Sequence, residues 1–307
     1  MLAHLSDVHL GPLPRLPLPL ATAKRLAGTL NWYRNRRHVH RPEAAEALAR
    51  DVIAQLPDHI AVTGDLTNIG LPEEVSRSAT WLGRLGAPHH VSVIPGNHDI
   101  YSTLRGRRLG VRALAPWAPH FASCEIGRQM LAAEAFPFVR VLEKGALRIA
   151  LIGLNSAVET PPLIATGVLG RAQRDALAKL LQHTRRAGYV RVVMLHHPPL
   201  PGLATASHCL TDAAELTQLL RAEGAELVLH GHNHRRMINT LAGPDGAIPI
   251  VGVPSASAAR SHRGEPLARA HFYEFRAGQE GRPHITLMAR GLGDPGHPIA
   301  ELERTVL

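Results

Sequence analysis

The chain has 307 residues, of which 45% are hydrophobic, and this is enough to bury a sizeable core in one large domain. Its formal net charge of +9 favours anionic partners, but only 4% of its residues are aromatic, which argues against a nucleic-acid reader that stacks bases. The two cysteines, Cys124 and Cys209, are isolated in sequence. They therefore predict neither a disulfide framework nor a cysteine-based zinc site, and they favour a reducing compartment.

The first residues, MLAHLSDVHL, predict no secretion signal, because their apolar residues run straight into polar ones. The longest uncharged run, residues 192–211, is broken by HHPPLPG, so it predicts no transmembrane helix. We therefore expect a cytoplasmic protein. A position at the inner face of the membrane is a further interpretation, which rests on residues 12–42.

Short apolar runs alternate with amphipathic patterns along most of the chain. We expect buried strands at 59–64, 91–94, 147–153, 190–195 and 225–230. We expect helices at 41–56, 71–86, 170–188 and 211–224, with glycines at three of their ends, Gly86, Gly188 and Gly224. Such alternation predicts an α/β layered fold. From about residue 245 the runs 247–253, 270–277 and 282–290 lack intervening helices, which predicts a β-rich C-terminal part of one domain spanning 1–307.

Polar clusters follow the predicted strands. Each cluster begins where a strand should end, and their members are Asp7 and His9, then Asp65, then Asn97, His98 and Asp99, then His196 and His197, and finally His230, His232 and His234. Ligands of open α/β sheets bind outside the carboxyl ends of the strands, so these clusters are expected to converge. Aspartate, histidine and asparagine without cysteine suit manganese, iron or zinc, and the set is large enough for two ions bridged by a carboxylate. The alternative is separate turn residues and packed histidines.

The motif series resembles the calcineurin-like metallophosphoesterases over residues 1 to about 235. The patterns D-x-H, G-D, G-N-H-D, H-x-P and G-H-x-H occur in the family's order, beginning at Asp7, Gly64, Gly96, His196 and Gly231. This resemblance implies an α/β fold in which a two-layered β sandwich is flanked by helices, with the active site at the carboxyl ends of strands. It also implies the ligands: Asp7, His9 and His234 for one ion, Asn97, His196 and His232 for the other, and Asp65 as the bridge.

The resemblance implies that metal-bound hydroxide attacks a phosphodiester. His98 would stabilise the phosphoryl oxygens or protonate the leaving group, with Asp99 fixing its orientation, although Asp99 is also open to interpretation as a helix cap. His196 is expected to be the ligand ahead of His197, and His230 a packed residue on its strand. The closest family pattern is that of bacterial phosphodiesterases that act on cyclic nucleotides or glycerophosphodiesters. The alternative of a non-catalytic protein-binding scaffold is disfavoured, because every ligand position is filled.

Residues 12–42 depart from compact members of the family. The segment carries seven basic residues and no acidic one: Arg15, Lys24, Arg25, Arg34, Arg36, Arg37 and Arg41. We expect a basic helix over 23–39, for which three interpretations stand. It binds an anionic membrane surface, as in a lipid-linked pyrophosphate or phosphodiester hydrolase of the lipid A precursor type; it caps the active site; or it is a solvated helix that packs Leu26, Leu30 and Trp32 on the domain. Nothing in the sequence predicts the oligomeric state.

Overall fold

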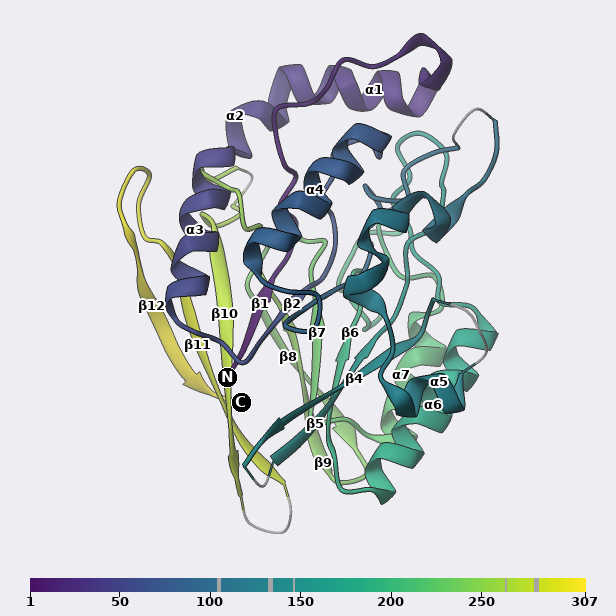
Figure 1. The fold of residues 1–307 in the computed structure, drawn as a ribbon, viewed down its shortest axis with the longest axis vertical. Helices are drawn as coiled ribbons and strands as arrows, with labels where there is room; N and C mark the ends of the chain where they lie inside the picture. Colours follow the sequence, from purple (N-terminus) through teal and green to yellow (C-terminus); the bar gives the residue numbers. More distant parts are fainter. Residues whose placement is uncertain (104–105, 132–134, 146, 263, 279–281) are drawn as a thin grey trace.

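Two mixed β-sheets form the centre of the molecule (Figure 1). The computed structural model describes residues 1–103, 106–131, 135–145, 147–262, 264–278 and 282–307. Within these residues each sheet has six strands, in the orders β12-β11-β10-β1-β2-β3 and β4-β5-β6-β7-β9-β8. The strands are β1 (Leu2–Leu5), β2 (His59–Val62), β3 (Val91–Val93), β4 (Phe138–Lys144), β5 (Leu147–Gly153), β6 (Val190–Met194), β7 (Leu227–His230), β8 (Met237–Gly243), β9 (Gly246–Gly252), β10 (Arg269–Ala277), β11 (Pro283–Leu292) and β12 (Ile299–Val306).

Parallel strands form one half of the first sheet and the middle of the second. In the first sheet β1, β2 and β3 are parallel, and the antiparallel strands β10, β11 and β12 extend the sheet from β1. In the second, β5, β6, β7 and β9 are parallel, with β4 and β8 antiparallel at the two edges. Because loops that leave parallel strands emerge at one edge, the segments after β1, β2 and β3 meet at the same edge.

Helices flank the sheets on their outer faces and across one end of the molecule (Figure 1). They are η1 (Leu18–Leu20), α1 (Ala23–Asn31), η2 (Trp32–Arg36), α2 (Arg37–Val39), α3 (Pro42–Ala54), α4 (Pro72–Leu85), η3 (Gly110–Phe121), α5 (Glu125–Met130), α6 (Arg171–Arg186) and α7 (Ala213–Glu223). Helix α3 packs on β10 and β12, whereas α6 packs on β6 and beside α7. The two-layered sandwich flanked by helices, predicted from the motif resemblance, is therefore confirmed.

Local sequence explains most of these elements. Strands β1, β2, β6 and β7 are buried along their whole length, as their continuous apolar runs predict. Helix α3 buries Ala45, Leu48 and Val52, which recur at helical spacing, and begins with a proline at its first position. The five predicted buried strands, the three predicted C-terminal β runs and the five predicted helical segments are present, including the segment 23–39, which forms α1, η2 and α2; β4, β8 and β12 were not predicted.

The carboxylate of Glu74 on α4 shapes the loop that follows β2. It accepts hydrogen bonds from the backbone amides of Asn68 at 2.7 Å, Ile69 at 3.2 Å and Leu71 at 3.0 Å. These are amides that the start of α4 and its preceding turn would otherwise leave unpaired in the interior. The loop that carries Asp65 is therefore fixed from the helix side as well as from the sheet.

Residues 12–42 form a helical segment across one end of the molecule, and we call them the cap (Figure 1). Trp32 is buried in a small apolar cluster with Leu13, Ile69, Leu71 and Tyr101. The prediction that the cap packs through Trp32 is thus confirmed, but it is wrong for Leu26 and Leu30, which are 56% and 50% exposed.

The guanidinium of Arg25 fastens the cap to the domain by donating to backbone carbonyls. Its five acceptors are the carbonyl oxygens of Leu20, Ile69, Gly70, Ser102 and Thr103, at 2.7 to 3.4 Å. Helix α1 also approaches the domain closely at Gly28, where a Cβ atom would lie 2.5 Å from the Tyr101 hydroxyl. The cap is therefore a docked part of the fold.

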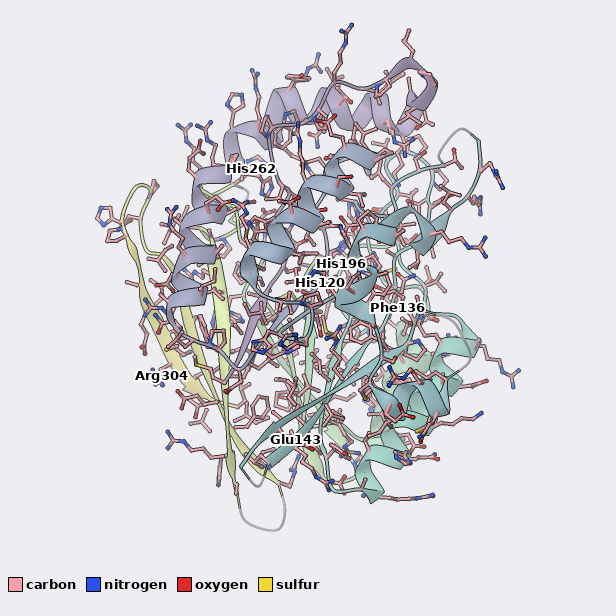
Figure 2. All side chains as sticks on the ribbon, viewed as in Figure 1. His120, Phe136, Glu143, His196, His262 and Arg304 are labelled. Atoms are coloured by element: carbon pink, nitrogen blue, oxygen red, sulfur yellow. The ribbon has the colours of Figure 1, made fainter. Side chains whose placement is uncertain are left out.

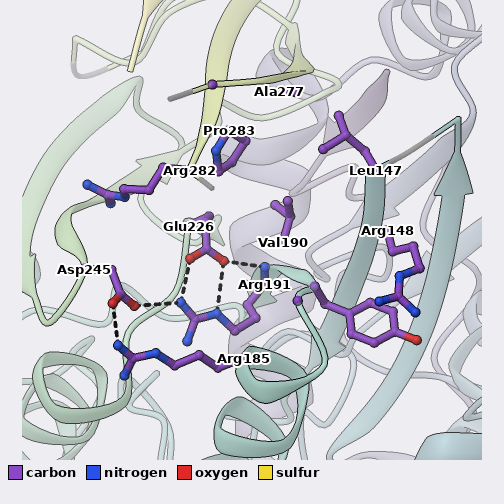
Figure 3. Close-up of a pocket in the computed structure, with 13 residues that line it drawn as sticks. Leu147, Arg148, Arg185, Val190, Arg191, Glu226, Asp245, Ala277, Arg282 and Pro283 are labelled. Atoms are coloured by element: carbon purple, nitrogen blue, oxygen red, sulfur yellow. Dashed lines mark hydrogen bonds and ion pairs between the residues drawn. The ribbon is translucent and has the colours of Figure 1, made fainter. Parts of the chain in front are cut away.

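A network of ion pairs surrounds Arg191 on β6 of the second sheet (Figure 3). Arg191 on β6 is 2% exposed, and its guanidinium pairs with Glu226 at 2.6 Å and with Asp245 at 3.3 Å. Arg185 on α6 pairs with the same Asp245. Each buried charge here has a partner, as burial requires, and the network ties β6 to the start of β7 and to the turn between β8 and β9.

Neither cysteine forms a disulfide, since Cys124 and Cys209 are both free and partly exposed. Among the helices in the described part of the chain, none combines the length and the apolar character that a membrane crossing needs.

Candidate metal centre

The residues that follow the strand ends adopt an unusual backbone conformation. Seven non-glycine residues in the described chain have positive φ, and five of them are predicted metal ligands: Asp7, His9, Asp65, His232 and His234. Left-handed backbone is disfavoured for L-residues, although aspartate and histidine tolerate it better than most. Such strain persists only where surrounding contacts enforce it, and it clusters at functional sites.

Backbone hydrogen bonds hold these turns against one another. The amide of Asp7 donates to the Gly64 carbonyl at 2.9 Å, and the amide of His9 donates to the Asp65 carbonyl at 2.9 Å. The His232 amide donates to Asp7 Oδ2 at 3.0 Å, which brings the loop after β7 onto the loop after β1. Side chains separated by more than 200 residues in sequence thus converge on one point.

Three of the predicted ligands form a first group. His234 Nε2 lies 3.3 Å from Asp7 Oδ1 and 3.3 Å from His9 Nε2. Both Asp7 and His9 are almost fully buried, and Asp7 Oδ1 accepts no hydrogen bond. A buried carboxylate oxygen without a donor, facing two imidazole nitrogens, is a suitable place for a cation.

The other three predicted ligands form a second group. Asn97 Oδ1 lies 3.1 Å from His196 Nε2 and 2.9 Å from His232 Nδ1, and the two histidine nitrogens are 3.3 Å apart. His196 is fully buried and lies in the interior of the molecule (Figure 2). One amide oxygen and two imidazole nitrogens again converge.

Asp65 lies between the two groups. Its Oδ2 atom is 3.9 Å from His9 Nε2 in the first group and 3.4 Å from His196 Nε2 in the second. Its Oδ1 atom accepts a hydrogen bond from the His98 backbone amide at 2.7 Å, which fixes the orientation of the carboxylate. Asp65 is thus a candidate for a bridge between cations held at the two groups.

Outer hydrogen bonds set the tautomers of the histidines. The Nδ1 atoms of His9 and His196 lie 3.1 Å from the Thr67 carbonyl and 2.7 Å from the Thr63 carbonyl. Because a carbonyl only accepts, both Nδ1 atoms carry the proton, and the Nε2 lone pairs face the centre. His234 Nδ1 lies 3.2 Å from Glu265, the carboxylate–histidine pairing common behind metal ligands.

Electrostatics supports the same fit. Burial alone lowers the pKa of His196, but the Asp65 carboxylate outweighs it and raises the pKa to about 9. Burial likewise opposes protonation of His234, yet Asp7 and Glu265 raise its pKa to about 10. The buried carboxylates are therefore stabilised by positive charge beside them, and two divalent cations at these two groups would supply that charge.

His98 and Asp99 lie on the turn after β3, with contacts that differ from expectation. His98 Nδ1 donates to the Asn68 carbonyl at 2.5 Å, and burial together with the Arg36 charge lowers the pKa of His98 to about 3. The Asp99 carboxylate instead accepts from the backbone amides of Asp65 and Gly96 at 2.7 and 2.9 Å. The expectation that Asp99 orients the His98 ring is therefore corrected, because Asn68 makes that contact and Asp99 caps backbone amides.

Two neighbouring histidines stay outside the centre. His197 has both ring nitrogens committed, one to Ser156 Oγ at 2.8 Å and the other to the Ala165 carbonyl at 3.1 Å. His230 is fully buried on β7 and contacts the Gly231 carbonyl at 3.1 Å. The geometry favours His196 over His197 as a ligand, as we predicted.

Sequence reasoning did not place His40 or Glu265 at the site, and it named Arg36 only as one of seven basic residues in residues 12–42. The ring of His40 lies 4.7 Å from that of His9 and 5.3 Å from that of His234, and the three together could hold a metal ion. His40 Nδ1 is 2.9 Å from the Ser257 hydroxyl, in the small-residue turn after β9. No motif marks these residues, because they reach the centre only through the docking of the cap and through the position of Glu265, which pairs with His262 in an isolated β-bridge.

A cavity of about 340 Å³ opens onto the centre. Asp65, Asn97, His98, His232 and His234 line its floor, and cap residues line one wall. Apart from Val39 and Ala165, its lining side chains are polar or charged. A small polar ligand is therefore the kind that this cavity suits.

Solved structures share this architecture. A dimetal phosphatase from Danio rerio superposes with a TM-score of 0.56 at 12% identity and covers 99% of this chain and 97% of its own. A purple acid phosphatase from yellow lupin seeds gives a TM-score of 0.52 at 12% identity, covering 99% of this chain and 53% of its own. At such identities the likeness concerns the fold, which is that of metal-dependent phosphatases.

The model of the calcineurin-like phosphoesterase family matches residues 1–236, and the chain belongs to this family. A probable cyclic nucleotide phosphodiesterase of Rhodococcus erythropolis is 29% identical over 191 residues, which are 61% of this chain and 54% of that protein. The glycerophosphodiester phosphodiesterase GpdQ of Enterobacter lignolyticus is 27% identical over 195 residues, 60% of each chain. The chain thus matches less than two thirds of the length of either relative.

The two ligand groups predict two metal ions per chain. After reconstitution with manganese, elemental analysis should find about two ions per chain. Asp65→Asn should lower this content and abolish turnover more completely than Asn97→Ala, because only Asp65 reaches both groups. A single ion in the wild type, or equal residual activities in the two variants, would refute the bridging role.

Proposed function

We propose that the chain hydrolyses a phosphodiester at a dinuclear centre of manganese, iron or zinc. The observation that carries this proposal is the position of Asp65, whose Oδ2 atom lies within 3.9 Å of His9 and 3.4 Å of His196, between two groups of three ligands. When bound, two cations would lower the pKa of a coordinated water and offset charge on the phosphoryl oxygens.

The chain's own residues have separate tasks in this proposal. The Asp7–His9–His234 group would hold one cation and the Asn97–His196–His232 group the other, with the outer hydrogen bonds keeping each ring in place. His98 stands on the turn next to Asn97, and its Nε2 atom lies on the cavity side. In the structure Nε2 accepts a hydrogen bond from Arg36 and carries no proton. An anionic phosphate beside the ring would favour its protonated form, which could then donate to a phosphoryl oxygen or protonate the leaving oxygen.

The substrate class follows from the relatives and the cavity together. The two matched proteins are named for cyclic nucleotides and for glycerophosphodiesters. The cavity wall offers amides and imidazoles and, in the described residues, no phenylalanine, tyrosine or tryptophan. Such a lining supports a small hydroxylated leaving group, so we place glycerophosphodiesters ahead of cyclic nucleotides.

A substrate panel tests the proposal. Manganese-loaded protein is assayed on glycerophosphodiesters, cyclic nucleotides, a lipid-linked pyrophosphate and phosphomonoesters. We expect kcat/KM to be highest on a glycerophosphodiester. Two bound metals without hydrolysis of any substrate would favour the non-catalytic scaffold, and a preference for phosphomonoesters would contradict a phosphodiesterase.

His98 is expected to act in catalysis without binding metal. His98→Ala should retain both ions, since its ring nitrogens contact Asn68 and Arg36 rather than the ligand groups, while kcat falls by about 10² to 10⁴. Elemental analysis and steady-state kinetics measure the two effects. A substrate with a very acidic leaving group should suffer a smaller penalty if His98 protonates the leaving oxygen. Loss of metal from the variant would reassign His98 as a ligand.

A lipid-linked substrate at a membrane surface is the second candidate. Four large apolar side chains are exposed on the cap, Leu18, Leu26, Leu30 and Tyr33. Arg34 and Arg37 are exposed on the same segment. Apolar side chains interleaved with arginine on one helical surface are typical of segments that lie in the interface of an anionic membrane.

Vesicle sedimentation tests this second candidate. Wild-type protein should sediment with vesicles of acidic lipid, and less so in 1 M salt, where the Debye length falls from about 8 Å to about 3 Å. Replacing Leu26 and Leu30 with Ser should weaken binding, whereas the same change at Ile53 and Leu56, exposed on and after α3, serves as the control. Absence of wild-type binding, or equal losses in both double variants, would contradict a membrane-binding cap.

A further inference from the structure

The basic residues of the cap separate into outward-facing and inward-facing groups. Arg25 donates to backbone carbonyls, and Lys24 donates to Thr160 Oγ1 at 2.7 Å, so both hold the cap in place. Arg36 also turns inward, but it reaches the cavity of the metal centre. It ends η2, a π-helical turn whose first residue, Trp32, is buried in the small apolar cluster under the cap. π-helical turns occur often at functional sites. Here the buried Trp32 anchors the turn, and its last residue, Arg36, carries a charged side chain into the cavity.

The hydrogen bonding of Arg36 leaves most of its donors uncommitted. Its Nη2 atom donates to His98 Nε2 at 2.8 Å. Its Nη1 atom is 3.3 Å from His98 Nδ1 and 3.5 Å from His9 Nδ1, but both of these nitrogens already donate to carbonyls and cannot accept. Among the residues that the structure describes, one firm hydrogen bond therefore serves a group with five N–H donors.

Arg36 also lacks a counter-ion at contact distance. Over residues 1–103, 106–131, 135–145, 147–262, 264–278 and 282–307, no carboxylate oxygen lies within 4.0 Å of its guanidinium. A guanidinium keeps its charge at any ordinary pH, and a partly buried charge without a partner is costly. The arrangement is one that an anion entering the cavity would complete.

We infer that Arg36 is a phosphate-binding residue, which donates two hydrogen bonds to non-bridging oxygens of the substrate phosphate. This rests on the proposed function, because the phosphate is the one held over the two ligand groups. The planar guanidinium matches the spacing of two phosphoryl oxygens, and such charge-assisted pairs are among the strongest hydrogen bonds in proteins. The cap is then part of the active site, because Arg36 lines the same cavity as Asp65 and Asn97.

A purely positioning role for Arg36 makes a different prediction. If Arg36 only held the His98 ring, its removal would have no effect once His98 is absent. If Arg36 binds phosphate directly, its removal weakens phosphate binding in the His98→Ala background as well. The comparison of single and double variants therefore separates the two roles.

The experiment measures the binding of inorganic phosphate to manganese-loaded protein by calorimetry. Arg36→Gln should raise the Kd about 10- to 100-fold, Arg36→Lys should be intermediate, and the loss should persist in the His98→Ala background. Arg34→Gln is the matched control, since it removes the same charge from the same turn at an exposed position. Elemental analysis should find unchanged metal content in every variant.

Kinetics on a small soluble phosphodiester completes the test, and kcat/KM should fall in Arg36→Gln but not in Arg34→Gln. Equal phosphate affinity in the wild type and Arg36→Gln would overturn the assignment, as would a loss that disappears in the His98→Ala background. Wild-type protein that binds phosphate through Arg36 but hydrolyses none of the panel substrates would instead refute the proposed function and leave the assignment of Arg36 standing. The two failures are thus distinguishable.

Discussion

The buried carboxylate of Asp99 is the contact on which the rest of the centre depends. It accepts hydrogen bonds from the backbone amides of Asp65, Thr67 and Gly96, at 2.7 to 2.9 Å, and from the Thr67 hydroxyl at 3.0 Å. It thereby ties the loop after β2 to the turn after β3. These two loops carry the bridging candidate and the amide ligand, so their separation is fixed by a residue that touches neither cation site. Asp99 follows His98 in sequence, but its carboxylate accepts hydrogen bonds from backbone amides and does not contact the His98 ring.

The cap closes one side of the cavity at the candidate metal centre. The sheets alone present an open edge with a metal-binding floor, and a segment between β1 and α3 closes one wall of it. His40 and Arg36 reach the floor from this segment, while Arg25 and Trp32 hold it down. The cap and the loops after the strands therefore contribute different residues to the same cavity.

Local pattern predicted the buried strands and the convergence of the polar clusters that follow them, for a physical reason. Buried parallel strands need continuous apolar runs, and residues that bind at the edge of the sheet stand directly after such strands. Both features can therefore be recognised in a short stretch of sequence. Strand β4, with FVRVLEK, pairs antiparallel with β5 at a sheet edge, where alternation with charged residues hides the apolar signal. The roles of Arg36, His40 and Glu265 depend on how distant segments dock, and the exposure of Leu26 and Leu30 depends on which side of the cap faces the domain. No local pattern carries that information.

The left-handed backbone at five of the ligand candidates has a consequence for how this protein tolerates change. Each such residue costs about 1 to 2 kcal/mol, so together they approach the entire net stability of an ordinary domain, about 5 to 15 kcal/mol. The surrounding scaffold must offset that cost before any cation arrives. Mutations that weaken the sheets therefore reduce the stability that holds these turns in place. In this fold, the strained turns of the ligand candidates and the tolerance to mutation therefore depend on the same margin of folding stability.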